Sequence, residues 1–546
     1  MSFRTNEYQQ MSMSDRLNSL TDRERRILDK SWARTFAERI FPMIDETKFK
    51  VLYCDDNGRP NTPVNIVIGS LLIKEMTHVT DEELYESVVL DPRYQYALHL
   101  TSYNEIPFSD RTVSRFRERL YRHELETGED LIREEMERLA SEFTKLMKIR
   151  GDLKRVDSVM VSSSCKNMGR LELIYTCVSN MVKALVKAGK GGMLPKHLLK
   201  YAEENNKNSV CYRMEKDEVM PRLEAVTADA LLVYELSGDL PGVDDEYRLL
   251  DRMLNDQMSG GTLKPNREIS PRSLQNPSDE DATFRRKSGK AYKGYTANIV
   301  EDCGEGIHII TQYDYDINLH SDAEFGAAMI ENLGKQEEKM VIIADGAYAS
   351  EANSKAAAGN NMELITTDLA GQKPQEIIAD FHIENDVILS CPAGHTPMDC
   401  EYKEKNEMYR AHFDKQTCES CPYKDECPVI MQKKRALVKI TKSSFNRAVY
   451  TKKLSSEEYK EYARKRNGVE GVPSILRRRY EIDRMPVRGL VRSKMWFGFK
   501  IGAINAKRVI AATLNPRHSA DIVKSCIHNL SVVSFRSRNL HPAFAT

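Results

Sequence analysis

Three acidic residues stand in sequence contexts that would bring them together as metal ligands. Asp157 lies in the β-branched run 154–164, and Asp345 follows directly on the apolar run Met340–Ala344, so both are predicted on strands or at their ends. Glu470 lies in a segment rich in Lys and Arg. Two such Asp residues and one Glu would hold a pair of divalent cations about 3.5–4 Å apart, which activates a water or a 3′-hydroxyl and stabilises the leaving oxygen of a phosphodiester. Hard carboxylate oxygens favour Mg²⁺ or Mn²⁺.

A structural interpretation of each acid taken alone stays open. A single Asp at the end of a strand is most often a helix cap or a turn former. For the third acid, other glutamates are present on either side of Glu470 and earlier in the chain: Glu301, Glu457, Glu458, Glu461 and Glu481.

The elements that would position these acids can be read from the pattern around them. MVIIADGAYAS, at 340–350, predicts a buried strand, a loop that begins at Asp345, and a helix capped by Ser350. In open α/β sheets, ligands bind at the carboxyl ends of strands, so Asp345 is where a functional acid is expected.

A cysteine cluster is the second group of residues that could do chemistry. Eleven cysteines are present, and four of them form a set with metal-ligand spacing: Cys391, Cys418, Cys421 and Cys427. Four thiolates would close a tetrahedral Zn²⁺ site with no open position for water, so such a site is structural. His395, His412 and Cys400 are possible substitutes as ligands, and a set of free buried thiols is the alternative.

Arginines crowd one predicted helix near the N-terminus. In SDRTVSRFRERL, Ser109 is a good N-cap, and Val113, Phe116 and Leu120 share one apolar face. A short helix, a turn and an Arg-rich helix fit a helix-turn-helix DNA reader, whereas the alternative is an amphipathic surface helix with a basic outer face. The residues predicted to contact DNA here are Arg111, Arg115, Arg117 and Arg119. Arg285 and Arg286 follow an acidic turn in a predicted β-hairpin that would also touch DNA.

Composition excludes several classes of protein. Of 546 residues, 41% are hydrophobic and 30% are charged, which is typical of a globular chain rather than a disordered or collagen-like one. No apolar run approaches the roughly 20 residues that a membrane span needs, and the N-terminus lacks a secretion signal, so a cytoplasmic protein is expected. The net charge is zero, but residues 431–510 hold 22 Lys or Arg against 6 Asp or Glu. Such a basic segment favours contact with a polyanion, and a solvated basic face is the alternative.

Four stretches of the chain resemble the bacterial insertion-sequence transposases of the DDE type. They are FSDRTVSRFRERL, VDSVMVSSSCKNMGR, VIIADGAYAS and RKRNGVEGVPSILRRRYEIDRMPVRGL. The family often has an Arg four residues before its Glu and a basic residue seven after it, and Arg466 and Arg477 occupy these positions. Ala463 stands where the family's Tyr is expected, and the glycines around Glu470 also depart from the pattern.

The resemblance implies specific roles and a fold. Asp157, on the first strand of a ribonuclease H-like sheet, Asp345, on the fourth, and Glu470 would be the catalytic acids with Mg²⁺ or Mn²⁺. Arg466 and Arg477, with Arg478, would contact phosphates of the transposon ends. The partners implied are double-stranded DNA, as terminal inverted repeats and as target, and further copies of the chain in an oligomer on DNA. A structural Zn²⁺ in the cysteine cluster before the third acid is also expected.

The predicted fold class is α/β, a ribonuclease H-like mixed sheet flanked by helices, with an all-helical N-terminal domain, a helical insertion and a small zinc-ribbon-like insertion. The predicted segments are a helical DNA-binding domain at 1–150, a catalytic core at 151–170 and 271–390, a helical insertion at 171–270, a cysteine-rich insertion at 391–430, a basic catalytic part at 431–515 and a tail at 516–546.

The expected function is DNA cleavage at terminal inverted repeats followed by strand transfer of the 3′-hydroxyl into target DNA. Two alternatives stay open: a catalytically inactive DNA-binding protein derived from a transposase, and a ribonuclease H-like nuclease that cuts without strand transfer.

Overall fold

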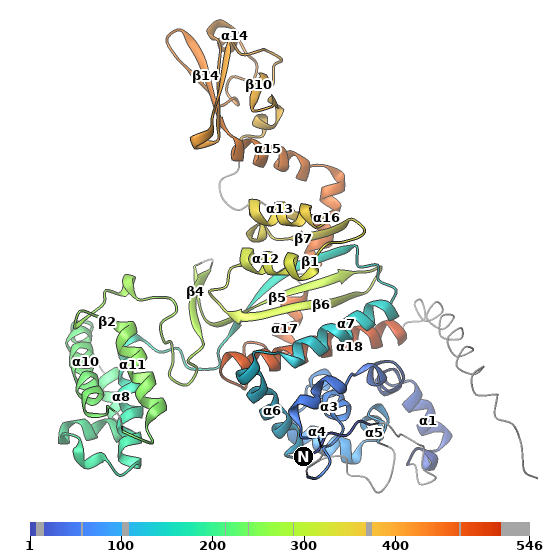
Figure 1. Ribbon diagram of the computed structural model, residues 1–546, viewed down its shortest axis with the longest axis vertical. Coiled ribbons are helices and arrows are strands. Elements are labelled where there is room, and N and C mark those ends of the chain that lie inside the picture. Colours follow the sequence, from blue (N-terminus) through green and yellow to red (C-terminus); the bar gives the residue numbers. More distant parts are fainter. Residues whose placement is uncertain are drawn as a thin grey trace, which may run out of the picture. The chain divides into compact units, whose positions relative to one another are not determined.

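The computed structural model describes residues 1–6, 16–55, 58–100, 109–212, 214–238, 240–287, 289–366, 374–468 and 471–514 (Figure 1). The chain divides into two compact units. The first comprises Met1–Arg150, Ser158–Ser321 and the chain from Val472 onward, and the second comprises Gly151–Asp157 and Asp322–Gly471. The predicted third acid, Glu470, and the predicted tail at 516–546 lie outside the described residues.

The first 150 residues form helices around one apolar core. Thr80 and Glu83 form the predicted capping box, each accepting a backbone N–H of the other residue, and the helix they begin ends before Pro92. The third helix is buried on nearly all sides, because its sequence is apolar almost throughout. The helices are α1 (Asp22–Asp29), α2 (Trp32–Thr35), α3 (Val64–Thr77), α4 (Asp81–Leu90), α5 (Pro92–Ala97), α6 (Thr112–Thr127) and α7 (Leu131–Leu146).

The long helix α18 (Leu490–Leu514) belongs to the same core. It packs against α3, α7 and strand β6, and Figure 1 shows it lying alongside α7. Phe497 is fully buried in this core. None of the described helices is long and apolar enough to cross a membrane.

The largest sheet among the described residues is mixed and has six strands. Its order is β4-β5-β1-β7-β8, and β6 also pairs with β5. The strand β1 is parallel to β7, and β7 is parallel to β8, whereas β4 and β6 are antiparallel to β5. The strands are β1 (Leu153–Ser162), β4 (Thr283–Lys287), β5 (Lys290–Cys303), β6 (His308–Ile317), β7 (Met340–Ala344) and β8 (Met362–Thr366). The predicted α/β class with a mixed sheet is therefore correct.

Two helices follow from the local sequence of the second unit. Ser321 and Glu324 predict a helix that runs to about Leu333, and helix α12 (Asp322–Leu333) has these bounds. Helix α13 (Glu351–Gly359) has the predicted Ser350 as its N-cap, with the Ser350 hydroxyl accepting the N–H of Asn353. Helix α13 packs on β8 and on α12.

Residues 171–270 are mostly helical, as predicted, and have an apolar core of their own. Its centre is made by fully buried side chains such as Ile174, Val178, Val233 and Leu250. The elements are α8 (Arg170–Lys187), α9 (Asn206–Cys211), α10 (Val219–Leu236), α11 (Asp244–Gln257) and a short hairpin of β2 (Met258–Ser259) and β3 (Thr262–Leu263).

The cysteine-rich segment folds as a small antiparallel sheet, which we call the cysteine module (residues 382–441). Its four-stranded sheet has the order β11-β12-β14-β13, and β9 pairs with β10 beside it. The strands are β9 (His382–Glu384), β10 (Val387–Ser390), β11 (Asp399–Lys403), β12 (Met408–Asp414), β13 (Val429–Met431) and β14 (Arg435–Thr441), and α14 (Lys415–Glu419) lies between them in the chain. The module therefore extends beyond the predicted segment 391–430 on both sides, because β14 supplies the pairing partner of β12.

From the sequence, Ser109 is expected as a helix cap, one helix is expected over Ser455–Arg466, and another is expected to begin at Pro473. All three helix starts differ in the structure. Helix α6 begins at Thr112 with Arg111 as its N-cap, so Ser109 is not the cap. Helix α16 (Glu457–Asn467) is capped by Ser456, and it is preceded by a helix that was not predicted, α15 (Lys442–Leu454). Helix α17 (Gly471–Arg478) begins two residues before Pro473, so this proline still lies in the first turn, where its missing N–H has no cost.

Candidate functional site

Strand pairing brings two of the predicted acids to the same place. Strands β1 and β7 are parallel, with Leu153 opposite Val341 and Arg155 opposite Ile343. This register, continued by two residues, puts Asp157 opposite Asp345 at the carboxyl end of β7. Paired strands lie about 4.8 Å apart, and residues two apart share a face, so both carboxylates belong to one face of the sheet. The sheet thus juxtaposes two acids that are far apart in sequence.

Asp345 is positioned by its own local structure. It is the N-cap of a short 3-10 turn at Gly346–Tyr348, and its Oδ1 accepts the N–H of Gly346 at 2.5 Å. The side chain is 46% exposed, and Nη2 of Arg466 lies 3.8 Å from its Oδ2. An exposed carboxylate at a strand end can bind a cation, and the arginine beside it can hold a phosphate next to that cation. Because short β4 comes before β5 in the chain, β7 is the fifth strand of this sheet rather than the predicted fourth.

Arg155 is a site residue that the sequence analysis missed. It lies two residues before Asp157 on β1, is 4% exposed, and its Nη1 donates a hydrogen bond to the carbonyl of Lys465 near the end of α16 at 3.0 Å. A Cβ at Gly468 would lie closer than 3.0 Å to that same Nη1. Gly468 therefore leaves room for the guanidinium that joins α16 to β1. A charged residue inside a predicted strand, two positions before a candidate acid, is the signal in the sequence that could have identified it.

Glu470, the predicted third acid, lies outside the described residues. Within the described ranges, no group of three or more His, Cys, Asp or Glu side chains is arranged to hold a metal ion. The two Asp residues supply the hard oxygen donors that Mg²⁺ or Mn²⁺ prefers, so the donor chemistry fits such an ion.

The predicted DNA-contacting arginines of α6 divide into two groups. Arg111 and Arg115 are exposed. Arg117 instead donates two hydrogen bonds to the carboxylate of Asp81, the shorter at 2.6 Å, and the guanidinium of Arg119 stacks over the ring of Tyr53 at 4.7 Å. Two of these four arginines therefore have partners within the protein.

The remaining predicted DNA contacts are similarly mixed. Strands β4 and β5 form the predicted hairpin, in which Arg286 is exposed, whereas Arg285 donates to the carbonyls of Asn318 and His320. In the first unit, Arg478 is exposed, and Arg477 lies 3.5 Å from the carboxylate of Asp483.

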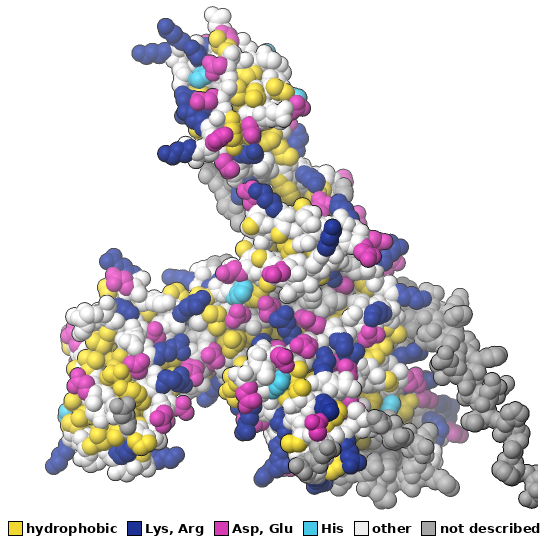
Figure 2. All heavy atoms as spheres, in the orientation of Figure 1, with side chains coloured by type: hydrophobic (Ala, Val, Ile, Leu, Met, Phe, Trp, Pro, Cys, Tyr) yellow, Lys and Arg dark blue, Asp and Glu magenta, His cyan; other side chains and the backbone are white. Residues whose placement is uncertain are grey.

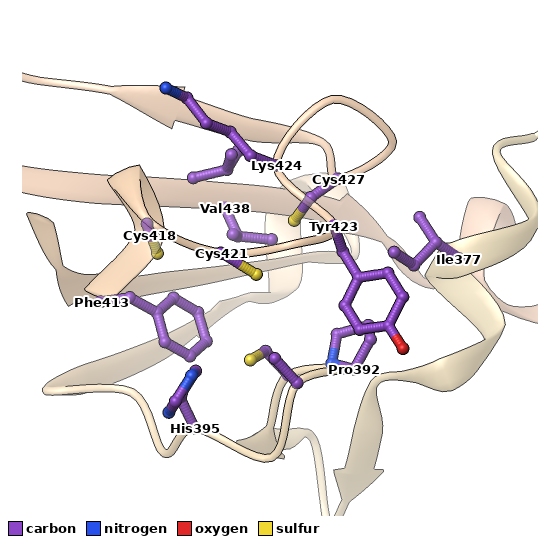
Figure 3. A pocket seen from close by; sticks show the side chains of 13 residues that line it. Ile377, Pro392, His395, Phe413, Cys418, Cys421, Tyr423, Lys424, Cys427 and Val438 are labelled. Atoms are coloured by element: carbon purple, nitrogen blue, oxygen red, sulfur yellow. The ribbon is translucent and has the colours of Figure 1, made fainter. Parts of the chain in front are cut away.

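The four predicted zinc-binding cysteines line one pocket of the cysteine module. Cys391, Cys418, Cys421 and Cys427 all contribute to its wall, together with His395 and apolar side chains such as Phe413. Figure 3 shows the sulfur atoms of Cys421 and Cys427 directed toward the interior of this pocket. The cysteines are gathered, but in the described arrangement they do not form a metal-binding group.

The electrostatics of this pocket are those of crowded thiols. Burial raises the pKa of Cys418, and the neighbouring thiols of Cys391 and Cys421 add to the effect. Burial and the same crowding raise the pKa of Cys427 to about 11. A thiolate is therefore unfavourable here unless a cation accompanies it, and the soft donor set suits Zn²⁺.

Comparisons with known proteins match two parts of the chain. A family described as transposase DDE domain matches residues 390–510, and a second described as transposase domain (DUF772) matches residues 25–119. No curated protein matches the sequence. The cryo-EM structure of a piggyBac transposase synaptic complex with hairpin DNA is similar at 10% identity over 70% of this chain and 76% of that chain. Its TM-score of 0.22 is too low to establish a common fold.

Proposed function

We propose that the chain is a DDE insertion-sequence transposase, which cleaves DNA at terminal inverted repeats and joins the 3′-hydroxyl to target DNA. Two transposase family models match the chain, at residues 25–119 and 390–510, and support this proposal. Asp157, Asp345 and Glu470 are the proposed catalytic acids. The observation that carries the proposal is the β1–β7 register, which brings Asp157 opposite Asp345. Neither family match includes these two positions, so the pairing supports the assignment independently.

The mechanism assigns a role to each residue of this arrangement. The two Asp carboxylates and Glu470 would hold Mg²⁺ or Mn²⁺, which when bound lowers the pKa of a water or 3′-hydroxyl and stabilises the leaving oxygen. Arg466, beside Asp345, would hold the phosphate that is attacked, and Arg155 fixes α16 on the strand that carries Asp157. Cleavage and joining are the same in-line displacement with a different nucleophile, so no energy cofactor is needed.

Strand order supports a ribonuclease H-like sheet in this proposal. Strands β5 and β6 form an antiparallel pair beside β1, and β7 and β8 continue the sheet in parallel on the other side of β1. This arrangement puts Asp157 on a central strand, where acids from neighbouring strands can converge.

Double-stranded DNA is the proposed partner, bound by several copies of the chain because two transposon ends must be brought together. The exposed arginines Arg111 and Arg115 of α6, Arg286 of the β4–β5 hairpin and Arg478 are the proposed phosphate contacts. A cytoplasmic, nucleoid-associated location follows from this partner.

Zn²⁺ is the proposed structural ion of the cysteine module. The support is the gathering of four thiols around one pocket and the raised pKa of Cys427, since a bound cation would remove the repulsion between thiolates. The ion would stabilise the small sheet and take no part in cleavage.

Substitution of the acids tests the catalytic proposal. A supercoiled plasmid carrying the element's own ends is incubated with Mg²⁺ or Mn²⁺ and with wild-type protein, Asp157→Asn or Asp345→Asn. Glu338→Gln is the matched control, because Glu338 is exposed and precedes β7 at the end opposite Asp345. We expect both Asp variants to bind the ends and to lose cleavage, while the control retains both activities.

Each alternative function has its own outcome in this assay. Specific binding without cleavage by the wild-type protein would support the inactive DNA-binding protein. Cleavage without joining to target DNA would support the nuclease. Cleavage by Asp345→Asn at the wild-type rate would refute the assignment of the acids.

A further inference from the structure

The basic residues of α18 are nearly all neutralised within the protein. Arg492 lies 2.9 Å from Glu118, Lys500 lies 2.7 Å from Glu75, and Arg508 lies 2.6 Å from Glu301. Lys494 is likewise paired with Glu124. Much of the basic character of residues 431–510 therefore serves the fold by matching acids of other elements, rather than forming a free basic face.

Lys507 is the exception on this helix. Its Nζ lies 3.5 Å from Nε2 of His78, a group that is itself basic. Arg479, which follows α17, is close enough to depress the pKa of Lys507. Among the described residues, no carboxylate lies within ion-pair distance of Lys507 or Arg479. Three basic groups from three separate elements thus face one another, and Glu75 is the carboxylate that acts on His78.

A buried hydroxyl belongs to the same cluster. The ring of Tyr480 lies 5.0 Å from the ring of His78, and Nζ of Lys507 lies 5.9 Å from the Tyr480 ring. Tyr480 is 2% exposed, and its hydroxyl has no hydrogen-bond partner among the described residues. A buried hydroxyl without a partner costs free energy. The charges that act on this one are those of Glu75, Arg508 and Arg479, and because Glu75 is paired with lysines, the hydroxyl remains a donor suited to an added anion.

The acids nearest the cluster are already engaged. Glu75 is buried and is shared between Lys500 and Lys74, at 2.7 and 3.3 Å. Glu481 pairs with Arg484 at 3.2 Å, and Glu301 pairs with Arg508. These ion pairs therefore leave the positive charges of Lys507 and Arg479 available to an anionic ligand.

We propose that His78, Arg479, Lys507 and the Tyr480 hydroxyl form a phosphate-binding site that holds a backbone phosphate of double-stranded DNA. The site is built from residues of the first unit only. The identity of the ligand as DNA rests on the proposed function, whereas the anion site rests on the geometry of the cluster. On the visible face of the molecule, Figure 2 shows Lys and Arg side chains interspersed with Asp and Glu, so DNA would be held by local sites of this kind.

Protonation accompanies binding at such a site. Burial, followed by Lys507 and Lys500, lowers the pKa of His78 below its ordinary value, and burial and Arg479 lower the pKa of Lys507. Without a ligand, His78 is therefore neutral at pH 7 and accepts a hydrogen bond from Lys507. An anion favours the charged form of both groups, so phosphate binding takes up a proton and is stronger below the free pKa of His78 than above it. The other charged groups that face His78 are Lys500 and Arg479, which oppose its protonation, and Glu75, which favours it.

The test measures binding of the full chain to two duplexes, one of random sequence and one carrying the element's end. The variant is Arg479→Gln/Lys507→Gln. The control is Arg23→Gln/Lys187→Gln, which removes the same charge from exposed positions on α1 and α8. Loss of one phosphate contact is expected to weaken binding about tenfold near 0.1 M salt and to lower the slope of log affinity against log salt by about 0.9. The loss should be equal on both duplexes, since a phosphate contact carries no sequence information.

A second arm separates DNA from small anions. The imidazole of His78 is followed by NMR in protein with ¹³C-labelled histidine, and the signal is assigned with His78→Asn, which tolerates the left-handed backbone at this position (φ 61°). We expect the pKa of His78 to rise when the random duplex is added at constant ionic strength. A rise with inorganic phosphate but not with DNA would overturn DNA as the ligand.

Two further outcomes bear on the phosphate site and on the proposed function. Unchanged binding and salt slope in Arg479→Gln/Lys507→Gln, together with an unmoved His78 signal, would overturn the site. A wild-type chain that binds neither duplex would refute the proposed function, while the inorganic phosphate arm would still decide the anion site.

Discussion

The substitution Gly468→Ala provides a sharp test of how α16 is held against the sheet. Gly468 has φ −65° and ψ −26°, so alanine is compatible with its backbone, and helix propensity alone would make the change neutral or slightly stabilising. The conflict is with the guanidinium of Arg155, which must move by roughly 1 Å to reach ordinary van der Waals distance from the new methyl group. That movement would break the hydrogen bond from Arg155 to the Lys465 carbonyl.

The expected loss follows from the position of Arg155. A displacement of about 1 Å in an element that orients reacting groups can cost about 10²-fold in rate. A charged hydrogen bond contributes about 1.5–3 kcal/mol, which corresponds to a similar factor. We therefore expect Gly468→Ala to slow single-turnover cleavage of a transposon end about 100-fold while leaving DNA affinity unchanged.

Gly471→Ala is the matched control, because among the described residues no atom outside its chain neighbours and the backbone of its own helix lies within 4 Å of a Cβ at that position. In the background Arg155→Met, the alanine at 468 should have little further effect, since the group it displaces is gone. Equal cleavage by Gly468→Ala and Gly471→Ala, or a loss of DNA binding in Gly468→Ala alone, would refute this account.

Three further predictions concern other contacts. Lys500→Met should lower the free energy of unfolding by about 3–5 kcal/mol in urea titrations, because the buried carboxylate of Glu75 loses one of its two paired cations. Adding Glu75→Gln to the same chain should restore part of the lost stability. Burial acts to raise the pKa of Glu75, but the nearby cations outweigh it and lower that pKa, so the stabilisation should be present above the ordinary carboxyl pKa and vanish as pH falls through the lowered value. Zn²⁺ binding at pH 7 should release at least two protons, measured calorimetrically in two buffers, because the pKa of Cys427 is about 11; release of none would contradict a thiolate site. Arg115→Gln should reduce the salt dependence of DNA binding, whereas Arg117→Gln should not, since its side chain is paired within the protein, and equal effects would contradict the division.

Parts of the fold with a strong local signal were predictable. The strand Met340–Ala344 and the Thr80 capping box were located to the residue, because an uninterrupted apolar run and a reciprocal pair of hydrogen bonds are encoded in neighbouring residues. Helix α15 was not predicted, because it is largely polar and Ala448 is its one side chain described as buried. The strands of the cysteine module were missed because their pairing partners come from both ends of the segment.

In the candidate site, too, contacts between residues far apart in the chain were not predictable from the sequence. The sequence predicted Asp157 and Asp345 on strands or at their ends, but their proximity follows only from the pairing of β1 with β7, continued by two residues beyond Arg155 and Ile343. The basic C-terminal segment was interpreted as a surface for a polyanion, whereas most charged side chains of α18 pair with acids up to 425 positions away. Arg155 and Gly468 were missed because their relation is a close approach in space that no spacing rule encodes.

The attachment of the cysteine module has a consequence for the entropy of the chain. The hydroxyl of Tyr450 accepts the N–H of Thr366 at the end of β8, and it donates to the carbonyl of Thr366, across 84 residues. Ile378 and Phe381 pack into the module's core, and Lys452 of α15 donates to the carboxylate of Asp380 between them. When the module is folded, about 14 residues therefore separate Thr366 from the contact that holds α15. Closing a loop of that length rather than one of 84 residues saves roughly 1.5 kcal/mol.

The folded module thus shortens the effective connection between strand β8 and helix α16, which carries Arg466. If the module unfolds, the effective concentration of α16 at β7 falls about tenfold, although no residue of the pair Asp345 and Arg466 has changed.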